Sequence, residues 1–132
     1  MRLVWTSRTL PAPDFEAWRL LTDVRLWPLW GPSVREARIE GGGYLLEPSC
    51  RGTVLTAVGV RLPFEVTEFE PGRHWAWSVA GVPATAHRVD RLSDEACEVA
   101  FGVPWAAAPY LLICRMALSH LGAIVRAGAP RA

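Results

Sequence analysis

Three histidines and three cysteines are the side chains of this 132-residue chain that ordinarily supply acid–base, nucleophilic or metal-binding chemistry near neutral pH. Both sets are widely and irregularly spaced: His74, His87 and His120; Cys50, Cys97 and Cys114. Neither set has the CxxC or HxxxH spacing of a metal site, so we predict no metal and no cofactor. All 14 basic residues are arginine, which excludes a catalytic lysine.

The composition limits the class of protein. A hydrophobic fraction of 51% and a formal net charge of +1 favour one globular domain over residues 1–132 that binds neither nucleic acid nor an anionic membrane. The odd number of cysteines and the absence of an apolar signal segment predict a cytoplasmic protein with reduced thiols. The longest charge-free apolar stretch, 101–114, contains two prolines and is shorter than the ~20 residues of a membrane span. We expect a monomer or a homodimer.

The chain order of the expected elements predicts an α+β fold. A strand at 2–10 precedes a helical pair, Asp14 to Trp30, in which apolar residues recur at a spacing of three. Six further strands and a long helix follow: 34–40, 50–59, 62–70, 73–80, 84–92, 96–103 and the helix 109–127. Short connections between the strands favour an antiparallel sheet of about seven strands.

Two turns predict the pairing of the last three strands. A three-residue loop at 81–83 puts Trp77 opposite His87 and Trp75 opposite Val89, and a turn at 93–95 puts His87 opposite Phe101. Both turns give one apolar face, and a shift by one residue would exchange the two faces. This face carries Trp75, Trp77, Val79, Thr85, His87, Val89, Cys97, Val99, Phe101 and Val103. The facing of Leu62 to Glu70 stays open, because its apolar side requires a four-residue loop or a bulge.

The C-terminal helix is expected to begin at Pro109 and to be amphipathic. Its polar stripe, expected to face water, is Arg115, Ser119, Gly122 and Arg126. The opposite side, expected to lie against the apolar sheet face, is Tyr110, Ile113, Cys114, Ala117, Leu121 and Ile124. Ala117 is a small residue at the centre of this side.

Two segments resemble the START-like helix-grip (SRPBCC) superfamily. TLPAPDFEAWRLLTDVRLWPLWGPSV at 9–34 is similar to its opening motif, and FEVTEFEPGRHWAWSVAG at 64–81 is similar to its central hairpin. The match most resembles the bacterial polyketide cyclase/dehydrase-like branch, which also includes lipid carriers. The resemblance implies a curved antiparallel sheet wrapped around the C-terminal helix, with a ligand cavity between them. It implies no shared catalytic residues, because the matching positions belong to caps, turns and core.

Such a cavity would be lined by the apolar sheet face and the helix side that covers it. The expected ligand-binding residues are Trp75, Trp77, Thr85, Phe101, Tyr110, Ile113, Cys114 and Ala117, with Trp27 and Trp30 near the opening. Apolar walls with a few polar groups are typical of a small-molecule pocket. The aromatic content favours a flat, hydrophobic ligand.

His87 is the candidate catalytic residue, since no other side chain on this face has an ordinary pKa near neutrality. It would serve as the base that enolises a β-keto carbon, with Thr85 or Tyr110 donating to the enolate oxygen. The alternative is a buried imidazole, hydrogen-bonded to a neighbour and stacked against Trp77. An open, wet pocket around His87 would favour a cyclase or dehydratase, whereas a dry, stacked imidazole would favour a non-catalytic carrier or sensor of a lipid-like ligand.

Overall fold

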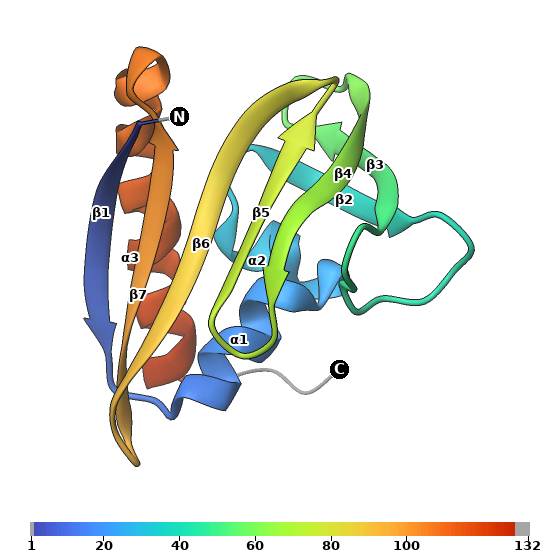
Figure 1. Ribbon diagram of the computed structural model, residues 1–132. Coiled ribbons are helices and arrows are strands. Elements are labelled where there is room, and N and C mark those ends of the chain that lie inside the picture. Colours follow the sequence, from blue (N-terminus) through green and yellow to red (C-terminus); the bar gives the residue numbers. More distant parts are fainter. Residues whose placement is uncertain (1, 129–132) are drawn as a thin grey trace.

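The computed structural model describes residues 2–128, which form one antiparallel sheet with helices on one of its faces (Figure 1). The elements in chain order are β1 Leu3–Leu10, α1 Asp14–Thr22, η1 Val24–Leu26, α2 Trp27–Trp30, β2 Val34–Ile39, β3 Arg51–Thr56, β4 Arg61–Glu70, β5 His74–Val79, β6 Val82–Ser93, β7 Ala96–Pro104, η2 Trp105–Tyr110 and α3 Leu111–Arg126. The seven strands have the order β1-β7-β6-β5-β4-β3-β2. This arrangement confirms the predicted helix-grip fold, with the short helices after the first strand and the long helix at the C-terminal end.

The β5–β6 hairpin differs from the predicted register. Its turn consists of two residues, Ala80 and Gly81, both in the left-handed region of φ, and a bulge follows between Ala76 and Ser78. Trp75 therefore pairs with His87, so the predicted Trp77–His87 and Trp75–Val89 pairs were wrong. The predicted faces survive, because a shift of two residues leaves every side chain on its own side of the sheet. Left-handed φ at a non-glycine residue is uncommon, and Ala80 gave no sequence signal for it.

The β6–β7 pairing agrees with the sequence at the positions that matter for the site. His87 lies opposite Phe101 and Val89 opposite Val99, as predicted. The turn itself is one residue shorter than expected, with Ser93 opposite Ala96, and a bulge at the preceding position restores the predicted register.

A bulge also settles the facing of β4, which the sequence left open. Phe64 and Val66 are buried on the helix-covered face, and the pairing with β5 shifts between Val66 and Glu68. Glu70 pairs with His74, so the connecting loop has three residues and the apolar side requires the bulge. Beyond the bulge, Phe69 packs edge-on against Trp18 of α1.

Helix α3 packs on the sheet through Cys114, Ala117, Leu118 and Leu121, all buried. By length and composition the segment Trp105–Arg126 could cross a membrane, but in this fold it is η2 followed by the helix that covers β1 and β7. Its predicted polar stripe is correct at Arg115, Ser119 and Arg126, which are exposed, and wrong at Gly122, which is buried. A Cβ at Gly122 would lie 2.9 Å from the Arg8 side chain of β1, so the helix approaches β1 closely there.

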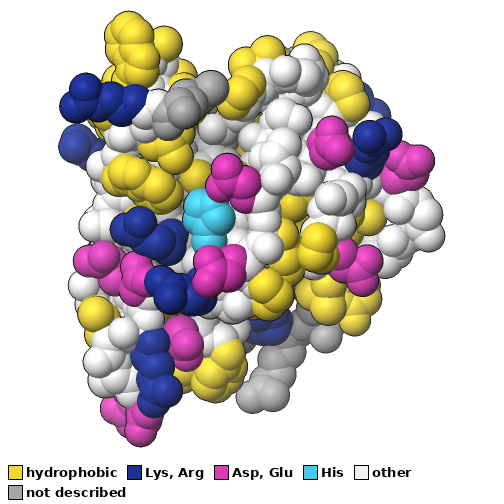
Figure 2. All heavy atoms as spheres, viewed as in Figure 1, with side chains coloured by type: hydrophobic (Ala, Val, Ile, Leu, Met, Phe, Trp, Pro, Cys, Tyr) yellow, Lys and Arg dark blue, Asp and Glu magenta, His cyan; other side chains and the backbone are white. Residues whose placement is uncertain are grey.

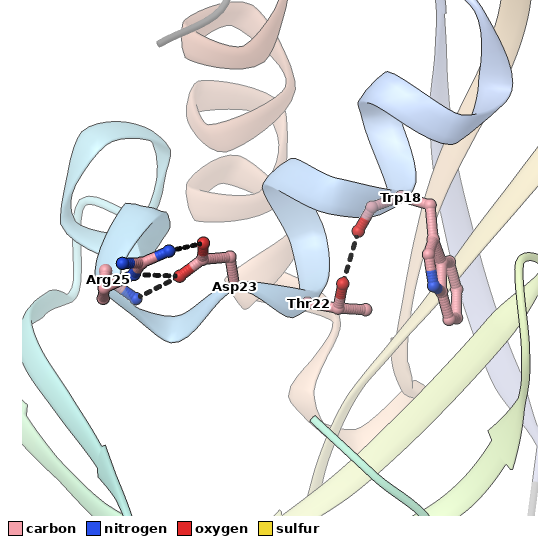
Figure 3. Close-up of polar contacts among 4 residues, drawn as sticks. All are labelled: Trp18, Thr22, Asp23 and Arg25. Atoms are coloured by element: carbon pink, nitrogen blue, oxygen red, sulfur yellow. Dashed lines mark hydrogen bonds and ion pairs between the residues drawn. The ribbon is translucent and has the colours of Figure 1, made fainter. Parts of the chain in front are cut away.

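The junction of α1 and η1 fixes the short helices that carry two of the site tryptophans (Figure 3). The buried carboxylate of Asp23 accepts hydrogen bonds from the backbone N–H, Nε and Nη2 of Arg25 at 2.8 to 3.0 Å. The Thr22 hydroxyl donates to the Trp18 carbonyl at 2.8 Å. The hydrogen bonds drawn in Figure 3 pair the Thr22 hydroxyl and the buried Asp23 carboxylate where the chain turns from α1 into η1 and α2.

The opposite face of the sheet is polar and ion-paired. Figure 2 shows basic and acidic side chains next to one another on this side of the molecule. His74 lies on it, with its Nε2 atom 2.8 Å from Glu68, and Arg88 pairs with Asp90 at 3.0 Å. His74 is therefore on the face opposite His87, as the predicted alternation requires.

Candidate functional site

A small cavity lies between the sheet and α3, beside His87. We call it the inner cavity; its volume is about 50 Å³. Its lining is Trp27, Trp30, Gly31, Pro32, Ser33, Val34, Trp75, Trp77, Thr85, His87, Phe101, Tyr110, Ile113, Cys114 and Ala117. The structure thus brings together His87 and all ten residues that the sequence analysis expected around a ligand.

A larger, more open pocket adjoins the inner cavity, and we call it the outer pocket. It has a volume of about 460 Å³ and mostly apolar walls. Its lining is Ser33, Val34, Val54, Thr56, Ala57, Val58, Trp77, Val79, Pro83, Ala84, Thr85, Val103, Pro104, Ala107 and Tyr110. Trp77, Thr85 and Tyr110 border both spaces, together with Ser33 and Val34. Sequence reasoning missed most of the outer pocket, although Val79 and Val103 were already on the predicted apolar face.

Trp27 and Trp30 lie deeper than expected. The sequence placed them near the opening, but they are only 2% and 7% exposed. Their indole N–H groups donate to the carbonyls of Leu21 and Leu20 at 2.9 and 2.8 Å, which draws α2 against the end of α1. The short helices therefore hold both indole rings packed against the helix-covered face of the sheet.

Aromatic rings surround His87. Its imidazole is stacked on the indole of Trp75, with ring centroids 3.9 Å apart and planes inclined by 24°. The edges of Phe101 and Trp77 approach it with centroid distances of 5.0 and 6.4 Å. The expected stacking partner was Trp77; Trp75 takes this position because it is the residue directly across the strand pair.

One hydrogen-bonded chain fixes the tautomer of His87. Nδ1 lies 3.2 Å from the Trp75 carbonyl oxygen, which only accepts, so Nδ1 carries the proton and donates it. Nε2 then accepts from the Thr85 hydroxyl at 2.9 Å. The Thr85 oxygen accepts in turn from the indole N–H of Trp77 at 2.9 Å. Both ring nitrogens of His87 are therefore hydrogen-bonded to protein groups, Nδ1 as donor and Nε2 as acceptor.

Burial makes His87 a weak base. The side chain is 3% exposed, and burial, which disfavours the imidazolium form, lowers its pKa to about 3. The hydrogen bond to the Trp75 carbonyl opposes this shift but does not cancel it. His87 is therefore neutral at physiological pH, and its one lone pair already accepts the Thr85 proton.

The boundary between the two spaces carries a hydrogen bond between distant parts of the chain. The hydroxyls of Ser33 and Tyr110 are 2.7 Å apart, although these residues are 77 positions apart in the sequence. Ser33 precedes β2, and Tyr110 is the last residue of η2. Tyr110 is 39% exposed, so this contact lies where the site meets solvent.

The cysteines and the metal-binding side chains offer no reactive centre. Burial raises the pKa of Cys97 and of Cys114 to about 11, which keeps both as thiols. Among residues 2–128, no group of three His, Cys, Asp or Glu side chains is positioned to hold a metal ion. The site thus has aromatic and apolar walls with a few polar groups, most of which are hydrogen-bonded within the protein.

Comparison with known proteins agrees with this geometry. Residues 1–101 match the family described as polyketide cyclase / dehydrase and lipid transport. No curated protein matches the chain.

Among solved structures, the chain is similar to XoxI from Bacillus cereus (17% identity, TM-score 0.70, 92% of this chain and 94% of that one). It is also similar to a protein from Chromobacterium violaceum (22% identity, TM-score 0.62, 93% and 96%). A third similar structure is the di-domain ARO/CYC BexL of the BE-7585A biosynthetic pathway (17% identity, TM-score 0.72), where the match covers 96% of this chain and 47% of BexL. The structural matches show the shared fold, and the family match extends over most of the sequence. This chain belongs to the polyketide cyclase/dehydrase and lipid transport family.

Proposed function

We propose that this protein binds a flat, hydrophobic small molecule between the sheet and α3, as a carrier or sensor. The observation that carries the proposal is the outer pocket, whose volume of about 460 Å³ lies within the range of roughly 300 to 1,000 Å³ typical of small-ligand sites. The adjoining inner cavity extends this space toward Trp75 and His87. Membership of a family that includes lipid transport proteins supports the same function.

The state of His87 favours a carrier or sensor over an enzyme. An acid–base catalyst needs a pKa near the working pH and a free position facing the substrate. His87 has a pKa of about 3, and both of its ring nitrogens are engaged with protein groups.

The unpaired state of Cys50, Cys97 and Cys114 suits the cytoplasmic location that we propose.

A cyclase or dehydratase acting through His87 is the second candidate. The observation in its favour is the position of His87 and Thr85 on the wall of the inner cavity, in a fold shared with the ARO/CYC protein BexL. A poly-β-ketone thioester incubated with the protein would distinguish the two candidates. A cyclised product that is lost in His87→Phe would support the enzyme, and unchanged thioester would support the carrier.

The binding proposal is tested by filling the outer pocket. Ala107 lines this pocket on η2, whereas its neighbour Ala106 is exposed and does not line it. We expect 2-isopropenylnaphthalene to change the tryptophan emission of the wild-type protein in a saturable way, because Trp77 borders both spaces. Ala107→Trp should weaken this binding at least about tenfold, and the matched variant Ala106→Trp should leave it unchanged. Absence of saturable binding to the wild-type protein, or equal loss in both variants, would overturn the proposal.

A further inference from the structure

The indole N–H of Trp75 is an unpaired donor in the wall of the inner cavity. Trp75 is 1% exposed, and its Nε1 atom is the one buried side-chain N or O atom within residues 2–128 that has no hydrogen-bond partner. A buried donor left unpaired loses its hydrogen bonds to water without replacement, so native proteins rarely leave one without a reason.

The other three tryptophans of the inner cavity are different. The N–H groups of Trp27 and Trp30 donate to backbone carbonyls, and that of Trp77 donates to the Thr85 hydroxyl. The fold therefore provides partners for the N–H groups around Trp75 but none for Trp75 itself.

In the part of the chain that the structure describes, no ring packed against Trp75 supplies an oxygen or nitrogen acceptor for this N–H. Trp77 lies edge-on to the Trp75 ring, with ring centroids 5.7 Å apart. Trp27 and His87 are both stacked on it, with centroids 5.5 and 3.9 Å away and planes inclined by 4° and 24°. Stacked rings cover the faces of an indole, whereas its N–H bond lies in the ring plane and donates outward from the edge. Trp75 lines the inner cavity, so a molecule held in that cavity is the acceptor considered for its N–H.

The polar groups around this cavity select the kind of acceptor. The Thr85 hydroxyl is hydrogen-bonded to both His87 and Trp77, and the Ser33 hydroxyl is hydrogen-bonded to Tyr110. A buried water generally makes about three hydrogen bonds, and most polar side-chain groups of this wall are already paired with one another. A carbonyl oxygen only accepts, so a single N–H donor is sufficient for it.

We propose that the indole N–H of Trp75 binds a carbonyl oxygen at the buried end of the ligand. The assignment rests on the proposed binding function and adds the ligand class: a flat hydrophobic molecule with a ketone, quinone or ester oxygen. The hydrocarbon part lies in the outer pocket, and the oxygen reaches the inner cavity.

Two probes of equal shape test the assignment. 2-Acetylnaphthalene has a carbonyl oxygen where 2-isopropenylnaphthalene has a methylene group. The measured quantity is the ratio of their dissociation constants, because differences in hydrophobicity cancel when this ratio is compared between protein variants. In Trp75→Phe, which removes the N–H, we expect the ratio to shift against the ketone by about fivefold to tenfold. Trp77→Phe removes an N–H that is already paired and should keep the wild-type ratio.

The outcomes separate the two proposals. If neither probe binds the wild-type protein, the binding function fails and the carbonyl assignment fails with it. If both probes bind but the ratio is the same in the wild-type protein and Trp75→Phe, the binding function stands and the assignment is overturned.

A measurement on the wild-type protein covers the case in which Trp75→Phe does not fold. The indole N–H proton of Trp75 can be assigned in a ¹⁵N-labelled sample from the through-space contacts of its own ring with the stacked rings of His87 and Trp27. We expect the ketone to move this resonance downfield and the alkene to leave it nearly in place. Equal shifts with both probes, or none with either, would contradict the assignment.

Discussion

The environment of His87 explains why a histidine facing a cavity need not be a catalyst. Its two ring nitrogens bond to Trp75 and Thr85, and the Trp75 indole covers one side of the imidazole. Burial without a carboxylate partner then lowers the pKa to about 3, so the neutral ring is a fixed part of the wall. The same contacts hold Thr85 and Trp77 where the two spaces meet.

The lowered pKa of His87 makes stability depend on pH. Below a pH of about 6.5 the histidine binds a proton in the unfolded chain but not in the folded protein, so the free energy of unfolding falls as the pH decreases toward 3. The slope from this residue is roughly 1.4 kcal/mol per pH unit. His87→Phe should lack this component, although it should be about 1 to 3 kcal/mol less stable at pH 7, because the Trp75 carbonyl and the Thr85 hydroxyl lose their partner. Urea unfolding at pH 7 and pH 4.5 should therefore show the two proteins converging, and parallel curves would contradict this.

Helix α3 and the sheet leave little space between them beside Cys114 and Ala117. Cys114 and Ala117 face the sheet and are 2% and 4% exposed, and the cavity beside them measures about 50 Å³. At about 30 Å³ per water molecule, this is room for one or two waters and not for a ring. Most of a ligand must therefore lie in the outer pocket, beyond the part of α3 that contains Ala117.

Ala117→Trp should overfill the inner cavity. We expect a loss of about 1 to 3 kcal/mol in the free energy of unfolding, with loss of the carbonyl preference of the two naphthalene probes. Arg115→Ala, on the exposed side of the same helix, should change stability by less than about 0.5 kcal/mol and leave binding intact. Chemical unfolding and probe titration of both variants check this. A fully stable Ala117→Trp protein would mean that α3 can move away from the sheet.

The site connects parts of the chain that are far apart in sequence. Its walls come from the short helices, the central strands and α3, and the Ser33–Tyr110 hydrogen bond joins the residue before β2 to the end of η2. This hydrogen bond lies at the exposed end of the site, between the segment before β2 and the end of η2. Ser33 and Tyr110 border both spaces, so their hydrogen bond lies at the boundary between the outer pocket and the inner cavity.

Loss of the Tyr110 hydroxyl should therefore accelerate exchange. In Tyr110→Phe we expect association and dissociation of 2-isopropenylnaphthalene to be several-fold faster, with little change in the dissociation constant, because one exposed hydrogen bond contributes about 0.5 to 1.5 kcal/mol. Tyr44→Phe is the matched control, since Tyr44 is exposed and lines neither space. Stopped-flow tryptophan fluorescence gives both rates. Unchanged rates in Tyr110→Phe would show that the contact does not limit entry.

The sequence by itself determined the order of the elements, the two faces of β5, β6 and β7, and most of the side of α3 that lies against the sheet. These properties follow from local periodicity and survive errors in register, since the two-residue error at the β5–β6 hairpin still left Trp75, Trp77 and His87 on the correct face. For this reason the sequence places Trp75, Trp77 and His87 on the face that meets α3, whereas the cavity between them was implied by the family resemblance.

The tertiary structure alone decided the depth and the pairing of these side chains. The two-residue turn at Ala80 and the bulge between Ala76 and Ser78 together put Trp75 across from His87, and the docking of α2 buried Trp27 and Trp30. The pKa of His87, the size of the outer pocket and the unpaired N–H of Trp75 all depend on which atoms from distant elements come into contact. Desolvation and hydrogen-bond pairing are properties of that packing, and no local pattern in the sequence contains them.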